Sequence, residues 1–230
     1  MGLGNREKKT YLRLSKGKFR KIVPEGTPNA VKVAVTDDNG NIVKYNYELQ
    51  WDNISGKVLS AKIMANQSND KYPDNFCILL MDEYGEKYII QVSTESGLYT
   101  KLLNKLCNPS INWNETLHFE AFYFESENKS AVVISQKDTK IEPLFTKEKP
   151  GDLPPFPVNA IDSNGKVINK DLMKIYQINT KLFLSNYFFA NVKIDPFSDL
   201  EEKHHEEPVS APVTNDDSTV PPNTEDDLPF

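Results

Sequence analysis

Residues 76–107 read FCILLMDEYGEKYIIQVSTESGLYTKLLNKLC, and the hydrophobic period changes within this stretch. Two apolar runs, at 76–82 and 87–92, flank a turn at Tyr84-Gly85 and predict a β-hairpin. Asn108-Pro109 ends a helical pattern that begins near residue 97 and is built on Leu98, Leu102, Leu103 and Leu106. The stretch therefore predicts two paired strands followed by one helix.

Upstream, strand-like runs at 30–36, 42–51 and 57–65 are separated by the turns Asp38-Asn39-Gly40 and Ser55-Gly56. Residues 42–51 alternate strictly, which predicts a half-buried strand and favours core packing for the aromatic side chains on its apolar face. That face consists of Val43, Tyr45, Tyr47, Leu49 and Trp51. Downstream, the runs at 116–124 and 130–136 predict two more strands.

The predicted elements follow the order of three or more strands, one helix and two strands. That order is the connectivity of the OB-fold, a five-stranded Greek-key barrel whose helix lies between strands three and four. We therefore expect a mainly β protein with an OB-fold-like five-stranded barrel, an added C-terminal segment and a disordered tail. A generic β-barrel and an α+β sheet are the alternatives.

Composition divides the chain into five regions. Residues 1–28 are a basic N-terminal arm, in which 1–21 carry eight basic side chains and one glutamate, and 29–142 are the barrel. Residues 143–168 are a Pro-rich strap. Residues 169–196 are a C-terminal helical segment that begins at the N-cap Asn169 and docks on the barrel or on another subunit. Its second half, 183–193, fits a helix or a strand. Residues 197–230 are an acidic tail.

Charge is divided unevenly along the chain. Residues 195–230 hold eleven carboxylates and one lysine, a net charge of −10, whereas the whole chain carries −6, so residues 1–194 carry +4. Residues 198–229 contain five prolines and no aromatic side chain, and they cannot bury enough apolar surface to offset the entropy of ordering. We expect this tail to be disordered. Many acidic tails only increase solubility, but an apolar tip after the densest acidic run suits a basic-rimmed hydrophobic pocket on a partner.

The closing residues 225–230, EDDLPF, resemble the C-terminal tip of bacterial and bacteriophage single-stranded DNA-binding proteins. The match covers six residues, and the preceding tail is rich in Glu, Pro and Thr where that family has Gly and Gln. The resemblance implies that the tip recruits replication and repair proteins, and that the tail competes with DNA for a basic groove. This role carries over to Asp226, Asp227, Leu228, Pro229 and Phe230.

Sequence-tolerant binding of single-stranded DNA needs aromatic faces for base stacking and cations that follow the phosphates. In an OB-fold the groove crosses strands two and three. The stacking candidates here are Trp51, Tyr72, Tyr84, Tyr88 and Trp113. The phosphate candidates are Arg13, Lys16, Lys18, Arg20, Lys21, Lys44, Lys57, Lys62, Lys71, Lys87 and Lys129. A single lysine on a strand is ordinarily just a solvent-facing residue, so only clustering of these cations would indicate a groove.

We expect no cofactor, no metal site and no enzymatic activity, because no Walker-type loop, paired-carboxylate motif or His/Cys metal-ligand spacing occurs. Cys77 and Cys107, without a CxxC motif, indicate buried reduced thiols. No apolar run reaches the ~20 residues that span a bilayer, so no membrane partner is expected. We expect the protein in the cytoplasm of a bacterium or of a phage-infected host.

Together these patterns predict a single-stranded DNA-binding protein that coats strands exposed in replication, recombination and repair, and recruits partner enzymes through Phe230. A homo-oligomer is compatible with the sequence. One alternative is a strand-annealing or recombination mediator with the same fold and tail. Another is a β-rich interaction or virion-assembly protein whose acidic tail is a docking peptide. The sequence does not separate DNA from RNA as the ligand.

Overall fold

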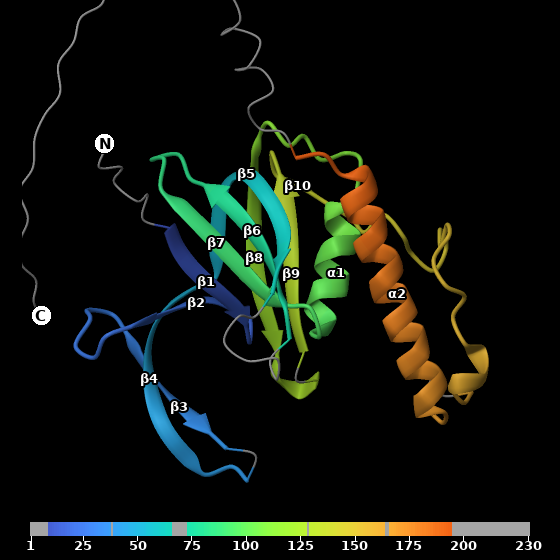
Figure 1. The fold of residues 1–230 in the computed structure, drawn as a ribbon, viewed down its shortest axis with the longest axis horizontal. Helices are drawn as coiled ribbons and strands as arrows, with labels where there is room; N and C mark the ends of the chain where they lie inside the picture. Colours follow the sequence, from blue (N-terminus) through green and yellow to red (C-terminus); the bar gives the residue numbers. More distant parts are fainter. Residues whose placement is uncertain (1–8, 38, 66–72, 128, 164–165, 195–230) are drawn as a thin grey trace, which may run out of the picture. The chain divides into compact units, whose positions relative to one another are not determined.

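The computed structural model describes residues 9–37, 39–65, 73–127, 129–163 and 166–194. Within these ranges the chain is mainly β, as expected: the strands form one ten-stranded mixed sheet, accompanied by two α-helices (Figure 1). No helix in these ranges is long and apolar enough to cross a membrane.

The elements agree closely with those expected between residues 30 and 136. The strands are β1 (Lys9–Ser15), β2 (Lys18–Val23), β3 (Val31–Thr36), β4 (Ile42–Trp51), β5 (Asn53–Met64), β6 (Asn75–Met81), β7 (Lys87–Ser93), β8 (Thr116–Phe124), β9 (Lys129–Gln136) and β10 (Thr139–Lys140). Helix α1 (Gly97–Leu106) lies between β7 and β8, and α2 (Lys170–Asn191) follows the strap. The expected hairpin at 76–92, the helix after it and the two strands after the helix are confirmed.

The sheet curls back on itself without closing. Its order is β10-β9-β8-β5-β6-β7-β1-β2-β4-β3, and all pairs are antiparallel except β1 with β7. Strands β2 and β8 are well separated in this order and still contact each other. The order nevertheless remains open from β10 to β3, so a closed five-stranded barrel is not confirmed.

The first two strands lie within the segment expected to be a basic arm. Residues 9–23 form β1 and β2, so the expected boundary at residue 28 does not separate an arm from the sheet. Leu12, Leu14 and Phe19 are buried in the core, whereas the cations between them face outward. The high density of Lys and Arg obscures this short period-two pattern, because it suggests a solvated segment.

One continuous core lies between the curled sheet and the helices. The leucines of α1 are buried, and Phe76 of β6 contacts the rings of Tyr99 in α1 and Phe188 in α2. Helix α2 starts at the expected N-cap, where the Asn169 side chain accepts a hydrogen bond from the Leu172 N–H, and it continues through Asn191. Residues 183–191 are therefore helical. Cys77 and Cys107 are buried and free, and burial raises the pKa of Cys107 to about 12.

The core role expected for the aromatic side chains of β4 is wrong. Strand β2 pairs with residues 47–51 of β4, so residues 42–46 pair only with β3, and this two-stranded ribbon extends away from the rest of the sheet (Figure 1). Tyr45 is 49% exposed and Trp51 41% exposed, whereas Leu49 is half-buried. Alternation identifies the apolar face of a strand, but it does not show that another layer covers that face.

The β1–β2 turn is held against β8 by a glycine. Lys16 and Gly17 have φ angles of 46° and 65°, the left-handed pair that a two-residue hairpin turn requires. A Cβ at Gly17 would lie 2.6 Å from both the carbonyl carbon of Phe122 and the backbone nitrogen of Tyr123. Only glycine fits this close approach, which places the turn beside the β8–β9 hairpin.

We expect Gly17→Ala to lower the free energy of unfolding by about 2–4 kcal/mol, from left-handed strain and from overpacking. Chemical denaturation measures this loss. Gly40→Ala is the matched control, because Gly40 has a φ of 84° and a Cβ added there would meet nothing within 4 Å. Only the conformational cost of about 1 kcal/mol is therefore expected for the control. Equal losses in the two variants would show that the approach to β8 contributes nothing.

Candidate nucleic-acid interface

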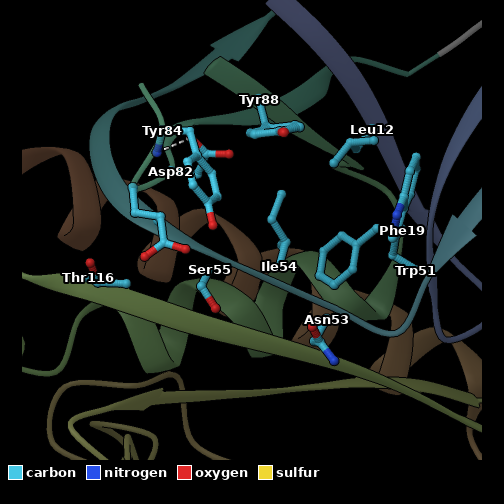
Figure 2. Close-up of a pocket in the computed structure, with 12 residues that line it drawn as sticks. Leu12, Phe19, Trp51, Asn53, Ile54, Ser55, Asp82, Tyr84, Tyr88 and Thr116 are labelled. Atoms are coloured by element: carbon cyan, nitrogen blue, oxygen red, sulfur yellow. Dashed lines mark hydrogen bonds between the residues drawn. The ribbon is translucent and has the colours of Figure 1, made fainter. Parts of the chain in front are cut away.

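Three of the five stacking candidates meet in one hollow of about 550 Å³, called the aromatic hollow below. Trp51 comes from the end of β4, Tyr84 from the β6–β7 turn and Tyr88 from β7. Figure 2 shows Trp51 on one side and Tyr84 on the other, with the apolar side chains of the floor between them. That floor consists of Leu12, Phe19 and Ile54.

The β6–β7 turn determines where Tyr84 lies. One carboxylate oxygen of Asp82, Oδ1, accepts hydrogen bonds from the backbone N–H groups of Tyr84 (3.0 Å) and Glu86 (2.9 Å). The Asp82 carboxylate therefore has a structural role in the turn. Tyr84 is 83% exposed, so its ring is presented to solvent beside the hollow. Such a ring is available for stacking without any rearrangement of the core.

Both tyrosines of the hollow remain neutral phenols at physiological pH. A hydrogen bond to Glu83 and the charge of that carboxylate raise the pKa of Tyr84. Burial raises the pKa of Tyr88, and the charge of Asp82 adds to that effect. The same carboxylates, Asp82 and Glu83, make the rim of the hollow unfavourable for a phosphate. The hollow therefore suits a nucleobase and not the backbone of a nucleic acid.

The face of the sheet that points away from the core, called the outer face below, carries three rows of side chains that strand pairing sets opposite one another. Row one consists of Lys57, Met81, Lys87 and Lys9. Row two consists of Ser60, Leu79, Ile89 and Tyr11. Row three consists of Lys62, Cys77, Gln91, Arg13 and Arg20. Two rows that contain cations therefore flank a largely apolar row.

Burial supports this assignment of faces. Ile78, Leu80 and Ile90 belong to the main core cluster, whereas Leu79, which is half-buried, and Ile89 and Cys77, which are buried, do not belong to it. Rows one and three are four residues apart along a strand, which corresponds to ~13 Å. Tyr11 of row two is 49% exposed. Row one also borders the aromatic hollow at Lys57, because Lys57 pairs with Thr116 of β8, which lines the hollow.

The phosphate candidates Arg20 and Lys18 are paired with carboxylates. Arg20 donates a hydrogen bond of 3.1 Å from Nη1 to Oε2 of Glu48, and both side chains are largely buried. Lys18 forms an ion pair with Asp52. These carboxylates neutralise Arg20 and Lys18, so the two cations contribute less to a positively charged surface for phosphates. Lys9, Lys62 and Arg13 of the outer face are exposed.

The remaining phosphate candidates divide between two places. Arg13, Lys16 and Lys129 line a second hollow, called the basic hollow below, at the end of β7 opposite to the aromatic hollow. Lys44 is exposed on the β3–β4 ribbon, and Lys21 pairs with Leu49 at the β2–β4 junction. Among the described residues, the structure therefore gathers Arg13, Lys16, Arg20, Lys57, Lys62, Lys87 and Lys129 on the outer face and around the basic hollow, but not Lys18, Lys21 or Lys44.

Among the other predicted residues, Trp113 is half-buried, packs against the core and does not line the aromatic hollow. Lys71, Tyr72 and the tip Asp226, Asp227, Leu228, Pro229 and Phe230 lie outside the described residues. The expected arm 1–28 is described only from residue 9, and the tail 197–230 lies outside the described ranges.

Sequence reasoning missed the middle row of the outer face and two cations, Lys9 and Lys101. The alternation of Leu12 and Leu14 with Tyr11 and Arg13 carries a signal for β1. The pairing of β1 with β7 leaves no signal in the sequence, because these strands are distant in sequence and parallel. Register alone brings Tyr11 beside Ile89.

A Ser–His contact was also missed. Ser55 Oγ lies 2.6 Å from His118 Nδ1, across the β5–β8 pair. Within the described ranges no carboxylate is bonded to the other ring nitrogen, and no group of three His, Cys, Asp or Glu side chains could hold a metal ion. The pair lacks the third group that orients the base in a nucleophilic site. We interpret it as a cross-strand polar contact.

Comparisons with known proteins identify no relative. No protein-family model, no curated protein and no solved structure matches this chain. The interpretation of the site therefore depends on its own geometry and charge.

Proposed function

We propose that this protein binds single-stranded nucleic acid, in the first place DNA, and coats strands exposed during replication, recombination or repair. The observation that carries the proposal is the convergence of Trp51, Tyr84 and Tyr88 in one hollow beside a row of lysines. These aromatic residues come from the end of β4, the β6–β7 turn and β7, and each is predicted from sequence to stack on bases. Stacking surfaces next to cations are what sequence-tolerant strand binding requires.

The aromatic hollow and the outer face bind different parts of the nucleic acid strand. Bases enter the aromatic hollow, whose acidic rim repels phosphates and whose floor is apolar. Phosphates follow the cations of rows one and three, and the middle row supplies apolar contact between them. Binding is therefore governed by backbone charge and stacking and not by base-specific hydrogen bonds.

The proposal includes an OB-fold-like unit built from β5, β6, β7, α1, β8 and β9, to which the β1–β2 hairpin is added. The order of these elements and the contact between β2 and β8 support it. OB-folds bind oligonucleotides across their second and third strands. In this chain those strands are β6 and β7, which contribute to every row of the outer face.

Further parts of the proposal concern the mode of action, the partners and the assembly of the protein. We propose that the protein acts by binding and not by catalysis, and that the acidic tip recruits replication and repair proteins in the cytoplasm of a bacterium or an infected host. The exposed aromatic and β-branched side chains of the β3–β4 ribbon would also allow contact with a second copy.

Tryptophan fluorescence tests the proposed site, because the chain has only two tryptophans. We expect oligo-dT to quench the fluorescence of full-length protein and of Trp113→Phe, because Trp51 is exposed beside the hollow. In Trp51→Phe the quenching should be largely lost, because Trp113 packs against the core.

Quenching carried by Trp113 alone would remove the aromatic hollow from the proposal. No quenching in any variant would favour the interaction or virion-assembly alternative. A strand-annealing mediator would show the same quenching and would also accelerate duplex formation from complementary oligonucleotides.

A further inference from the structure

The basic hollow, of about 330 Å³, collects four cations from four separate segments. They are Arg13 of β1, Lys16 of the β1–β2 turn, Lys101 of α1 and Lys129 of β9. No carboxylate is among the residues that line it in the part of the chain described, whereas Asp82 and Glu83 line the aromatic hollow. Its polar lining is completed by Ser15, Ser93, Ser96 and Ser130.

The fold holds these cations close together despite their electrostatic repulsion. The close approach of Gly17 to β8 brings Lys16 beside the start of β9. Lys101 follows Gly97 by four residues and lies on the same side of α1. Arg13, Lys16 and Lys101 form no ion pair with any residue in the described ranges. Like charges gathered in one hollow repel each other, and a bound anion relieves that repulsion.

The first turn of α1 adds a weaker attraction for an anion. Gly97 and Leu98 line the hollow at the helix start, and this first turn carries no acidic side chain. The Ser96 side chain caps the helix by accepting a hydrogen bond from the Tyr99 N–H, and it leaves the two earlier N–H groups of the turn uncapped. Partial positive charge at the start of the helix therefore reinforces the four cations.

We propose that the basic hollow binds one phosphate group of a nucleic acid strand. This inference rests on the proposed function and assigns a specific contact within it. Arg13 belongs both to row three and to the hollow, so the outer face leads directly into it. The basic hollow lies at the opposite end of β7 from the aromatic hollow, and the residues of β7 that line them, Tyr88 and Ser93, are ~17 Å apart along the strand. A strand with a base in one hollow thus reaches the other with a phosphate.

Two variants of the full-length protein test the site by different changes of its charge. Lys101→Glu reverses one lining charge, and Gly97→Asp adds a carboxylate where a Cβ meets nothing within 4 Å. An aspartate in the first turn of a helix is also favourable for folding. The controls are Gly97→Ala at the same position and Lys174→Glu, a matched charge reversal at an exposed residue of α2 outside the hollow.

The measurement is the affinity of each variant for an internally labelled oligo-dT with a 5′-phosphate, a 3′-phosphate or hydroxyl ends. We expect Lys101→Glu and Gly97→Asp to weaken binding roughly tenfold to a hundredfold, with the slope of log affinity against log salt reduced by about 1. Gly97→Ala should match the wild type, and Lys174→Glu should have an effect of less than about threefold.

The three oligonucleotides distinguish the source of the phosphate. Weakening confined to one phosphorylated end assigns a terminal phosphate to the hollow, and equal weakening for all three assigns an internal phosphodiester. If Lys101→Glu and Gly97→Asp bind all three oligonucleotides with the same affinity as Lys174→Glu, the inference is overturned and the proposed function still stands. Failure of the wild type to bind any of the three would overturn both.

Discussion

Trp51→Ala combined with Tyr84→Ala should weaken oligo-dT binding roughly 30-fold to 10⁴-fold. Each base stacked on an aromatic side chain contributes about 1–3 kcal/mol, so removal of two such surfaces removes about 2–6 kcal/mol. Both side chains are exposed, Trp51 at the end of β4 and Tyr84 in the β6–β7 turn, so their truncation leaves the core intact. Anisotropy titration at constant salt measures the loss, and a denaturation curve shows that folding is preserved.

Phe124→Ala is the matched control for this double variant. Phe124 is an exposed aromatic residue at the end of β8, and it does not line the aromatic hollow. Its replacement should change the affinity less than about twofold, because Phe124 is an exposed aromatic residue that is not placed to stack on a base in the aromatic hollow. Equal effects of the control and the double variant would mean that aromatic residues contribute through general surface properties, and the hollow would lose its role.

Raising salt from 50 mM to 200 mM should lower the affinity for oligo-dT roughly 300-fold. The slope of log affinity against log salt for single strands is about −0.7 per phosphate neutralised. About six contacts, drawn from the outer face and the basic hollow, give a slope of about −4. Titrations at four or more salt concentrations determine the slope.

Lys9→Gln with Lys62→Gln separates the outer face from general electrostatics. Both lysines are exposed, one in row one and one in row three, and the double variant should reduce the slope by about 1.4. Lys147→Gln with Lys174→Gln removes the same charge from exposed positions of the strap and of α2, and should leave the slope unchanged. An unaltered slope in the outer-face variant would show that the strand takes another path.

The sequence allowed the elements between residues 30 and 136 to be predicted because their periods are clear. Strict alternation identifies β4, and the leucine spacing identifies α1. The same alternation misled on Tyr45, because the β3–β4 ribbon continues past the end of β2 and loses the layer that would cover it. The period of a strand does not reveal how far its neighbours extend.

The site could be predicted in its residue types but not in its arrangement. Trp51, Tyr84 and Tyr88 were among the five aromatic residues predicted to stack on bases, and the structure brings these three together. The rows of the outer face depend on the parallel pairing of β1 with β7, which no local pattern encodes. Lys101 was missed for a similar reason, because its role depends on the glycine that seats the β1–β2 turn beside β8.

The central claim is that residues 1–196 bind single strands through charge and stacking, and that the acidic tail opposes this binding. An anisotropy titration of labelled oligo-dT against the full-length protein and a version ending at Pro196, at low and moderate salt, tests it most directly. The account predicts salt-sensitive binding by both forms, tighter for the truncated one, because the acidic tail competes with phosphates for the same cations. Absence of binding by both forms would contradict the account and leave the tail as a docking peptide on a protein with another role.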